Sequence, residues 1–312
     1  MGAIRFRSVW GFQFLLILAA GIMGFSQSRP VAGTSLRSIS VESEPDATVW
    51  IDGVRYGKTG KTGSLDINTL ASGSHTLRLR ADGFKEKIQP LTAVQSGSVK
   101  IPLVKTTDEA ELAFQEAERL AGADRDKAVA AYQRAIKLRP TYAEAYLGLA
   151  RLQSDASNFD DAQKAVAAAR RLRPGLAEAS AIQGRIYKDN GEEAKAVATF
   201  KRAITEGKGF QPEAYAGLGL LYKEKAEGSS GDFQAENDNY DEAAKNLKMA
   251  IKQLAGAPDS IVIYQLLGLI YERQQKAKEA IAVYEEFLRL FPNSVEATAV
   301  QSFIVQLKKD NP

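Results

Sequence analysis

The chain contains no cysteine and only one histidine, His75, in 312 residues. Without cysteine there is no disulfide bond, thiolate metal ligand, cysteine nucleophile or acylated lipoprotein cysteine. A metal site of clustered imidazoles would need more than one histidine, so we assign His75 a structural or surface role. Carboxylates are scattered beside Lys and Arg, and no acid–base pair stands apart. We therefore predict no catalytic residue, no metal and no cofactor, and a protein that is not an enzyme.

The chain also lacks a large excess of either charge, because it contains 41 Lys and Arg and 38 Asp and Glu residues, a net charge of +3. Removing residues 1–26 takes away two arginines and no acid, which leaves the remainder close to neutral. Nucleic-acid-binding proteins carry a clustered basic excess, so we expect no nucleic-acid partner.

Long apolar runs occur only at the N-terminus, where Arg5 and Arg7 precede residues 9–25. Gly24 and Ser26 supply a small-x-small cleavage site, so residues 1–26 are predicted to be a secretory signal peptide and residues 27–35 a linker. The alternative is an uncleaved leader that anchors the chain in the inner membrane, although the run is short for a spanning helix. The favoured location is the periplasm or the exterior.

Residues 36–105 show the alternation of β-strands rather than a helical period. Asp52-Gly53 and Asp82-Gly83 supply tight turns between apolar segments. We predict six or seven strands in a small antiparallel domain that packs as a sandwich. Its inward residues are expected to include the pairs Ile39 and Val41, Val49 and Ile51, Leu77 and Leu79, and Ile101 and Leu103.

This segment resembles the PEGA domain family, although Pro45-Asp46-Ala47 lacks the glycine of the family's first turn. The resemblance implies a bacterial envelope or surface module without an assigned catalytic role. Gly57-Lys58-Thr59 lacks the first glycine of a phosphate-binding loop, and we interpret it as a flexible inter-strand loop. The positions that fit the family are Val49, Ile51, Asp52, Gly53, Gly57, Gly73, His75, Leu77, Gly83 and Phe84.

The rest of the chain repeats itself: Ala128, Ala162 and Ala196 stand 34 residues apart, as do Pro140 and Pro174. A two-helix unit of this length cannot bury its apolar stripe alone, so neighbouring units must stack. The upstream helices carry a large-x-x-large-small-x-x-aromatic pattern, in which small residues allow close helix approach.

The pattern resembles the tetratricopeptide repeat (TPR) family, and with it the predicted fold is multidomain: an all-β PEGA-like sandwich followed by an all-α TPR solenoid. An insertion near 228–239, rich in Gly, Ser, Asp and Asn, is predicted to be an exposed loop. The five expected units are 108–140, 141–174, 175–209, 210–258 and 259–292, followed by a capping helix over 293–309.

The TPR resemblance implies that ligands contact the first (A) helix of each repeat. Arg151 and Arg185 occupy the same repeat position and could bind carboxylates of an acidic peptide. The alternative is that Glu144 and Glu178 neutralise them internally. Aligned by their small residues, the repeats place on this wall Glu144, Leu147, Arg151, Glu178, Arg185, Lys188, Glu213, Lys223, Gln265 and Leu269.

Our leading hypothesis is therefore a non-enzymatic scaffold of the bacterial cell envelope that binds a protein or peptide in the concave face of the solenoid. In the alternative, the PEGA-like domain binds cell-wall glycan or another surface polymer, and the solenoid is a spacer or oligomerisation module. The stacking residues would then be Trp50, Tyr56 and Phe84, with Trp50 on the face opposite Val49 and Ile51. In either case, contact with a membrane is expected only through an uncleaved leader.

Overall fold

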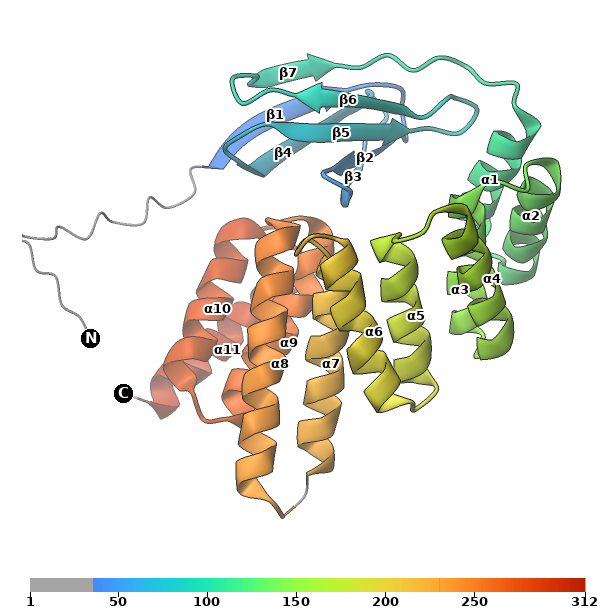
Figure 1. Cartoon of the computed structure of the whole chain (residues 1–312). Helices are drawn as coiled ribbons and strands as arrows, with labels where there is room; N and C mark the ends of the chain where they lie inside the picture. Colours follow the sequence, from blue (N-terminus) through green and yellow to red (C-terminus); the bar gives the residue numbers. More distant parts are fainter. Residues whose placement is uncertain (1–35, 230, 312) are drawn as a thin grey trace, which may run out of the picture. The chain divides into compact units, whose positions relative to one another are not determined.

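Two β-sheets and a row of antiparallel helices make up the part of the chain that the computed structural model describes, residues 36–229 and 231–311 (Figure 1). The predicted signal peptide and linker lie outside these residues. Residues 35–312 form one compact unit. No helix within the described ranges is long and apolar enough to span a lipid bilayer.

The sandwich consists of one three-stranded sheet in the order β4-β1-β7 and one four-stranded sheet in the order β3-β2-β5-β6. The alternating aliphatic residues of both sheets meet in a core in which Val41, Val49, Leu77 and Leu79 are fully buried. The strands are β1 (Leu36–Glu42), β2 (Thr48–Ile51), β3 (Val54–Lys58), β4 (Ser64–Ala71), β5 (His75–Arg80), β6 (Lys87–Leu91) and β7 (Gly97–Lys100).

The expectation of an antiparallel domain is wrong for one pair, because β7 runs parallel to β1, with Ile39 opposite Gly97 and Val41 opposite Val99. The chain reaches β7 from β6, which belongs to the other sheet, so the connection is a crossover and not a hairpin. Alternation in a sequence shows which face a residue occupies but carries no information on strand direction.

Gly57-Lys58-Thr59 is not a flexible loop. Its first two residues end β3, and Thr59 is buried. The Thr59 hydroxyl donates to the carbonyl of Glu44 at 2.6 Å and accepts from the amide of Ala47 at 2.9 Å. Asp46 takes the positive φ (58°) that glycine would supply in this turn. The side chain of Thr59 therefore stabilises the turn that lacks the family's glycine.

Each expected repeat contains an antiparallel helix pair, and α11 follows the last pair. Aspartate caps begin the first two helices: Asp108 accepts from the amides of Ala110 and Glu111, and Asp124 from that of Lys127. The helices are α1 (Glu109–Leu120), α2 (Arg125–Leu138), α3 (Ala143–Asp155), α4 (Phe159–Leu172), α5 (Ala177–Asp189), α6 (Glu193–Glu206), α7 (Pro212–Gly228), α8 (Phe233–Leu254), α9 (Ile261–Arg273) after the 3-10 turn η1 (Pro258–Ser260), α10 (Ala277–Leu290) and α11 (Ala297–Asp310).

The inserted segment near 228–239 is mostly helix rather than loop. α7 continues to Gly228 and α8 begins at Phe233, so the two helices of the fourth repeat are longer than those of its neighbours. Asp232 caps α8 by accepting from the amide of Ala235. The local composition predicted a loop. Instead, α8 begins before Ala235 and Glu236, and these residues and the asparagines after them lengthen the helix that the repeat pattern predicts farther along the chain.

Glycine allows the aromatic residue of one helix to wedge between two others. A Cβ placed on Gly184 of α5 would lie 2.5 Å from the Phe200 ring, and one on Gly217 of α7 would lie 2.3 Å from the same ring. Phe200 of α6 is 1% exposed. Because the ring is confined from both sides, it cannot move away from either position. This wedge joins the third repeat to the fourth.

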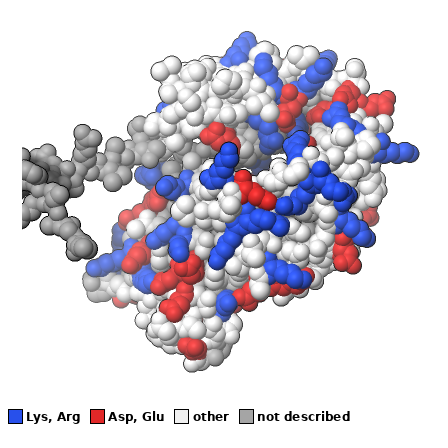
Figure 2. All heavy atoms as spheres, viewed as in Figure 1, with Lys and Arg blue, Asp and Glu red and all other residues white. Residues whose placement is uncertain are grey.

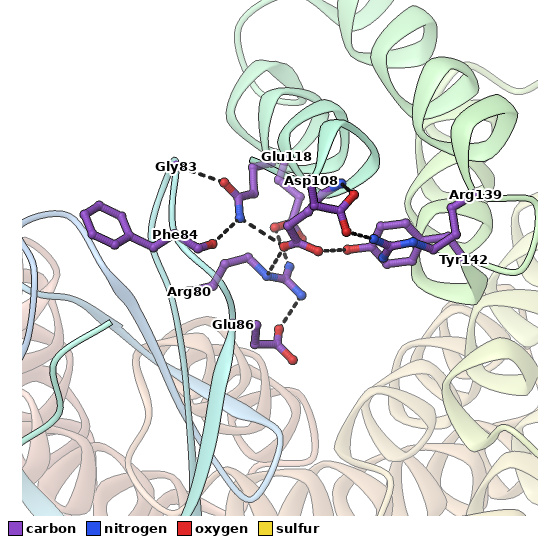
Figure 3. A network of polar contacts seen from close by, with 10 residues as sticks. Arg80, Gly83, Phe84, Glu86, Asp108, Glu118, Arg139 and Tyr142 are labelled. Atoms are coloured by element: carbon purple, nitrogen blue, oxygen red, sulfur yellow. Dashed lines mark hydrogen bonds and ion pairs between the residues drawn. The ribbon is translucent and has the colours of Figure 1, made fainter. Parts of the chain in front are cut away.

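The sandwich is joined to the first repeat through Arg80 of β5, which is 8% exposed (Figure 3). Its guanidinium pairs with Glu86, donates to Glu118 of α1 at 2.6 Å, and lies 4.6 Å from the centre of the Phe114 ring. Burial alone would lower the pKa of Arg80, but Glu118 and Glu86 raise it above its ordinary value, so the group remains charged.

A second group of hydrogen bonds surrounds this ion pair. The Gln115 side chain accepts from the amide of Gly83 and donates to the carbonyl of Phe84, both at 2.8 Å. Glu111 accepts from Gln115 at 3.0 Å and from the Tyr142 hydroxyl at 2.6 Å. Burial and the hydrogen bond to Glu111 raise the pKa of Tyr142. The network thus links the β5–β6 turn to the first repeat and to the start of the second.

The sandwich also contacts the turn between α8 and α9. Arg55 pairs with Asp259 at 3.3 Å, and the hydroxyl of Tyr56 donates to the carbonyl of Ala255 at 3.4 Å. A Cβ on Gly256 would lie 2.8 Å from Thr69, so glycine is required for this close approach. The β domain is therefore fixed at both the first repeat and the junction of the fourth and fifth repeats.

Substituting Gly184→Ala or Gly217→Ala is expected to destabilise the protein. Overpacking against the confined Phe200 ring costs about 1–3 kcal/mol, of which better helix propensity returns at most about 1 kcal/mol. The free energy of unfolding, measured by urea denaturation, should fall for both variants. Gly228→Ala is the matched control, because a Cβ there meets nothing within 4 Å. Equal stability of Gly184→Ala and Gly228→Ala would contradict the wedge.

Substituting Arg80→Met is expected to lower the free energy of unfolding by about 1.5–3 kcal/mol, because the charge-assisted hydrogen bonds from the buried guanidinium to Glu86 and Glu118 are lost. Arg119→Met is the control. This arginine is 58% exposed and lies 3.6 Å from Asp82, so its loss should change stability very little. If the two variants were equally stable in urea denaturation, the network would not hold the sandwich to the repeats.

Candidate ligand-binding cavity

A cavity of about 680 Å³ lies between the four-stranded sheet and the N-terminal parts of several A helices. This volume falls within the range of about 300–1,000 Å³ that is usual for ligand sites. We call it the sandwich–repeat cavity. The side chains that matter for its chemistry are Trp50, Arg55 and Arg78 from the sandwich and Arg151, Glu178 and Glu213 from the helices.

The sandwich wall is a cross-strand row of one aromatic and two cationic side chains. Trp50 on β2 is the register partner of Arg55 on β3 and of Arg78 on β5. The Arg78 guanidinium lies 4.2 Å from the centre of the Trp50 ring, within the range of a cation–π contact. All three residues are on the face opposite the sandwich core, because side chains alternate along each strand.

The helical wall contains a ladder of charges from three consecutive repeats. Arg151 of α3 donates to Glu178 of α5 at 2.9 Å and to Glu213 of α7 at 2.6 Å. Both glutamates lie in the first turn of their helices, where a negative charge is favourable. Burial alone would lower the pKa of Arg151, but Glu213 and Glu178 raise it. The guanidinium therefore stays charged, and two protein carboxylates already pair with it.

The structure unites residues that the sequence assigned to two competing sites. Trp50, from the proposed polymer-binding set, shares the cavity with Arg151, Glu178 and Glu213, from the proposed peptide-binding set. Of the two alternatives for Arg151, internal neutralisation by Glu178 is what the structure shows, with Glu213 as a second partner. A ligand would find Arg151 in contact with carboxylates.

The other predicted wall residues lie outside the cavity lining, and the charged ones among them are paired. Gln265 is half-buried and Leu269 is 39% exposed on α9. Glu144 does not neutralise Arg151 or Arg185. The ion pairs are Glu144 with Arg173 at 2.5 Å, Arg185 with Asp155 at 2.9 Å, Lys188 with Glu224 at 3.2 Å, and Lys223 with Glu227 at 2.6 Å.

Two predicted contact residues are buried and present no surface to a ligand. Leu147 is 2% exposed, because its position on α3 faces the core shared with α4 and α5. Tyr56 is 8% exposed. Burial, and to a smaller extent the negative charge of the nearby Asp52, raises the pKa of Tyr56 to about 12. Phe84 is half-buried and packs against the sandwich core. The open aromatic surface expected for polymer stacking is therefore absent at Tyr56.

His75 bridges two segments of the sandwich. Its Nδ1 lies 2.7 Å from Asp52 Oδ2, and its Nε2 lies 2.9 Å from the carbonyl oxygen of Ala71. Both ring nitrogens thus have protein partners, which agrees with a structural role. Within residues 36–229 and 231–311, no group of three or more His, Cys, Asp and Glu residues is arranged to hold a metal ion.

Sequence reasoning missed Arg55 and Arg78. The signal was available in HTLRLR, where Arg78 alternates with buried Leu77 and Leu79 and so shares the outer face with Trp50. What could not be read from the sequence is that this face lies against the A helices.

On the surface visible in Figure 2, basic and acidic side chains are interspersed, without an extended field of one sign.

Comparison with known proteins identifies both parts of the chain. Family models match the PEGA domain over residues 36–107, a TPR repeat over 124–154, and tetratricopeptide repeats over 147–210 and 264–294. No match was found among curated proteins.

Several solved structures are similar in fold. Yeast Tom70 is 20% identical with a TM-score of 0.52, over 65% of this chain and 41% of that chain. TTC0263, a thermophilic TPR protein of Thermus thermophilus, is 20% identical with a TM-score of 0.48, over 63% and 99%. MamA protein is 23% identical with a TM-score of 0.42, over 62% and 96%. The family models show that the protein consists of a PEGA domain followed by tetratricopeptide repeats.

Proposed function

We propose that this protein is a non-enzymatic scaffold of the bacterial cell envelope that binds a segment of a partner protein in the sandwich–repeat cavity. Tetratricopeptide repeats are protein-interaction modules, and the repeats matched here supply the helical wall of the cavity. The observation that carries the proposal is the cavity itself, since it combines apolar side chains with charged groups of both signs.

The apolar part of the lining supports a peptide ligand. Phe210 is 42% exposed beside the cavity, and Leu176 is half-buried there. Such side chains can receive the apolar residues of an extended segment, while polar groups fix its register. The site proposed here therefore lies between the sandwich and the repeats, and not on the helices alone.

The envelope location rests on the leader. Arg5, Arg7 and the apolar residues 9–25 support export, and PEGA modules are expected at bacterial surfaces. The balanced charge of the remaining chain agrees with a protein ligand rather than a nucleic acid.

Filling the cavity should abolish partner binding. The full chain, Ala216→Trp and Ala167→Trp would each be used to capture envelope proteins, with mass spectrometry as the readout. Ala216 lines the cavity, whereas Ala167 is exposed on α4 away from it. We expect a protein that is retained by the wild type and by Ala167→Trp and reduced at least about tenfold by Ala216→Trp. Equal capture by Ala216→Trp would exclude the cavity as the site.

The export proposal predicts a mature chain that begins at Gln27. Intact mass and N-terminal sequencing of the protein recovered from the periplasmic fraction would test this. A protein that retains residues 1–26 in the membrane fraction would instead support the anchored form, and one found uncleaved in the cytoplasm would refute export. The control is Arg5→Glu with Arg7→Glu, which should impair export by removing the positive n-region.

A further inference from the structure

Arg78 differs from the other cations of the sandwich–repeat cavity. Arg55 is paired with Asp259 at 3.3 Å, and Arg151 is held by Glu178 and Glu213. Among residues 36–229 and 231–311, no carboxylate forms an ion pair with Arg78. Its Nε atom is shielded from solvent without a hydrogen-bond acceptor. Partial removal of a charged group from water costs free energy when no anion compensates it. Arg78 is such a group, and it lines the cavity.

The guanidinium of Arg78 is nevertheless held in place. The Trp50 ring lies beneath it at 4.2 Å, and backbone pairing between β2 and β5 sets the two residues opposite each other. Stacking on one face leaves the edge of the guanidinium plane free to donate hydrogen bonds. That edge matches a carboxylate, which accepts two parallel N–H bonds from such a fork.

The opposite wall restricts which anions fit. Glu178 and Glu213 share the single cation Arg151, so this ladder carries an excess negative charge. A dense polyanion would be repelled by these carboxylates, whereas an isolated acidic side chain could reach Arg78 on the far wall. The apolar residues Leu176, Phe210 and Ile263 also line the cavity and suit an apolar neighbour of that acid.

We propose that Arg78, stacked on Trp50, binds the carboxylate of an acidic residue flanked by apolar residues in an extended segment of the partner. This inference rests on the proposed function and adds the chemical class of the ligand. It differs from the contact expected from the repeats, because the cation that recognises the ligand comes from the PEGA domain and not from an A helix.

A display library of random 12-residue peptides, selected in parallel on the full chain and on Arg78→Gln, would test the proposal. Peptides selected by the wild type should be enriched in Asp or Glu next to Leu, Ile or Phe, and Arg78→Gln should lose the acidic preference. Replacing the acid of a selected peptide by its amide should weaken binding about tenfold or more, measured by fluorescence polarisation. Arg78→Lys, which keeps the charge without the fork, should bind with intermediate affinity.

Arg289→Gln is the matched control, since Arg289 is 60% exposed on α10 and outside the cavity. It should select the same peptides as the wild type, and circular dichroism should show Arg78→Gln to be folded. Peptides without acidic enrichment, the same acidic motif on Arg78→Gln, or displacement by inorganic phosphate would overturn the ligand class while leaving peptide binding intact. Failure to select any peptide would count against the proposed function as well.

Discussion

A buried guanidinium is costly unless carboxylates compensate its charge, and Arg80 is compensated by carboxylates from both parts of the chain. Glu86 belongs to the sandwich and Glu118 to α1, so neither part alone supplies the full compensation. Gln115 strengthens the junction by bonding to the backbone of the β5–β6 turn. The PEGA domain is therefore held against the first repeat, and the position of the cavity walls depends on this junction.

Local periodicity in the sequence was enough to predict the sandwich and the repeats. The recurrence of Ala128, Ala162 and Ala196 reflects a geometric demand that is the same in each unit, namely close approach of two helices. The direction of β7 and the helical extension of the fourth repeat were not predictable in this way. Both depend on contacts with distant segments, and composition over a few residues does not contain them.

The residues of the candidate site were harder to predict from the sequence than the fold was. Alternation correctly placed Trp50 on the outer face of its sheet but did not show that Arg78 would cover its ring. Repeat alignment placed Leu147 on a helix face without showing that this face is interior. Trp50 from the predicted aromatic site shares one cavity with three residues of the predicted peptide site, Arg151, Glu178 and Glu213. This is because the sandwich contacts the repeats at two separated points.

The two contacts between the sandwich and the repeats affect how the number of repeats can change in evolution. An open solenoid can gain or lose a unit by duplication or deletion, because each unit contacts only its neighbours. Here one β domain contacts Glu118 in the first repeat and Asp259 at the start of the fifth. Adding a repeat between them would separate anchors that the sandwich keeps at a fixed spacing. Contacts of the PEGA domain with the first and fifth repeats thus restrict the number of repeats that fit between them.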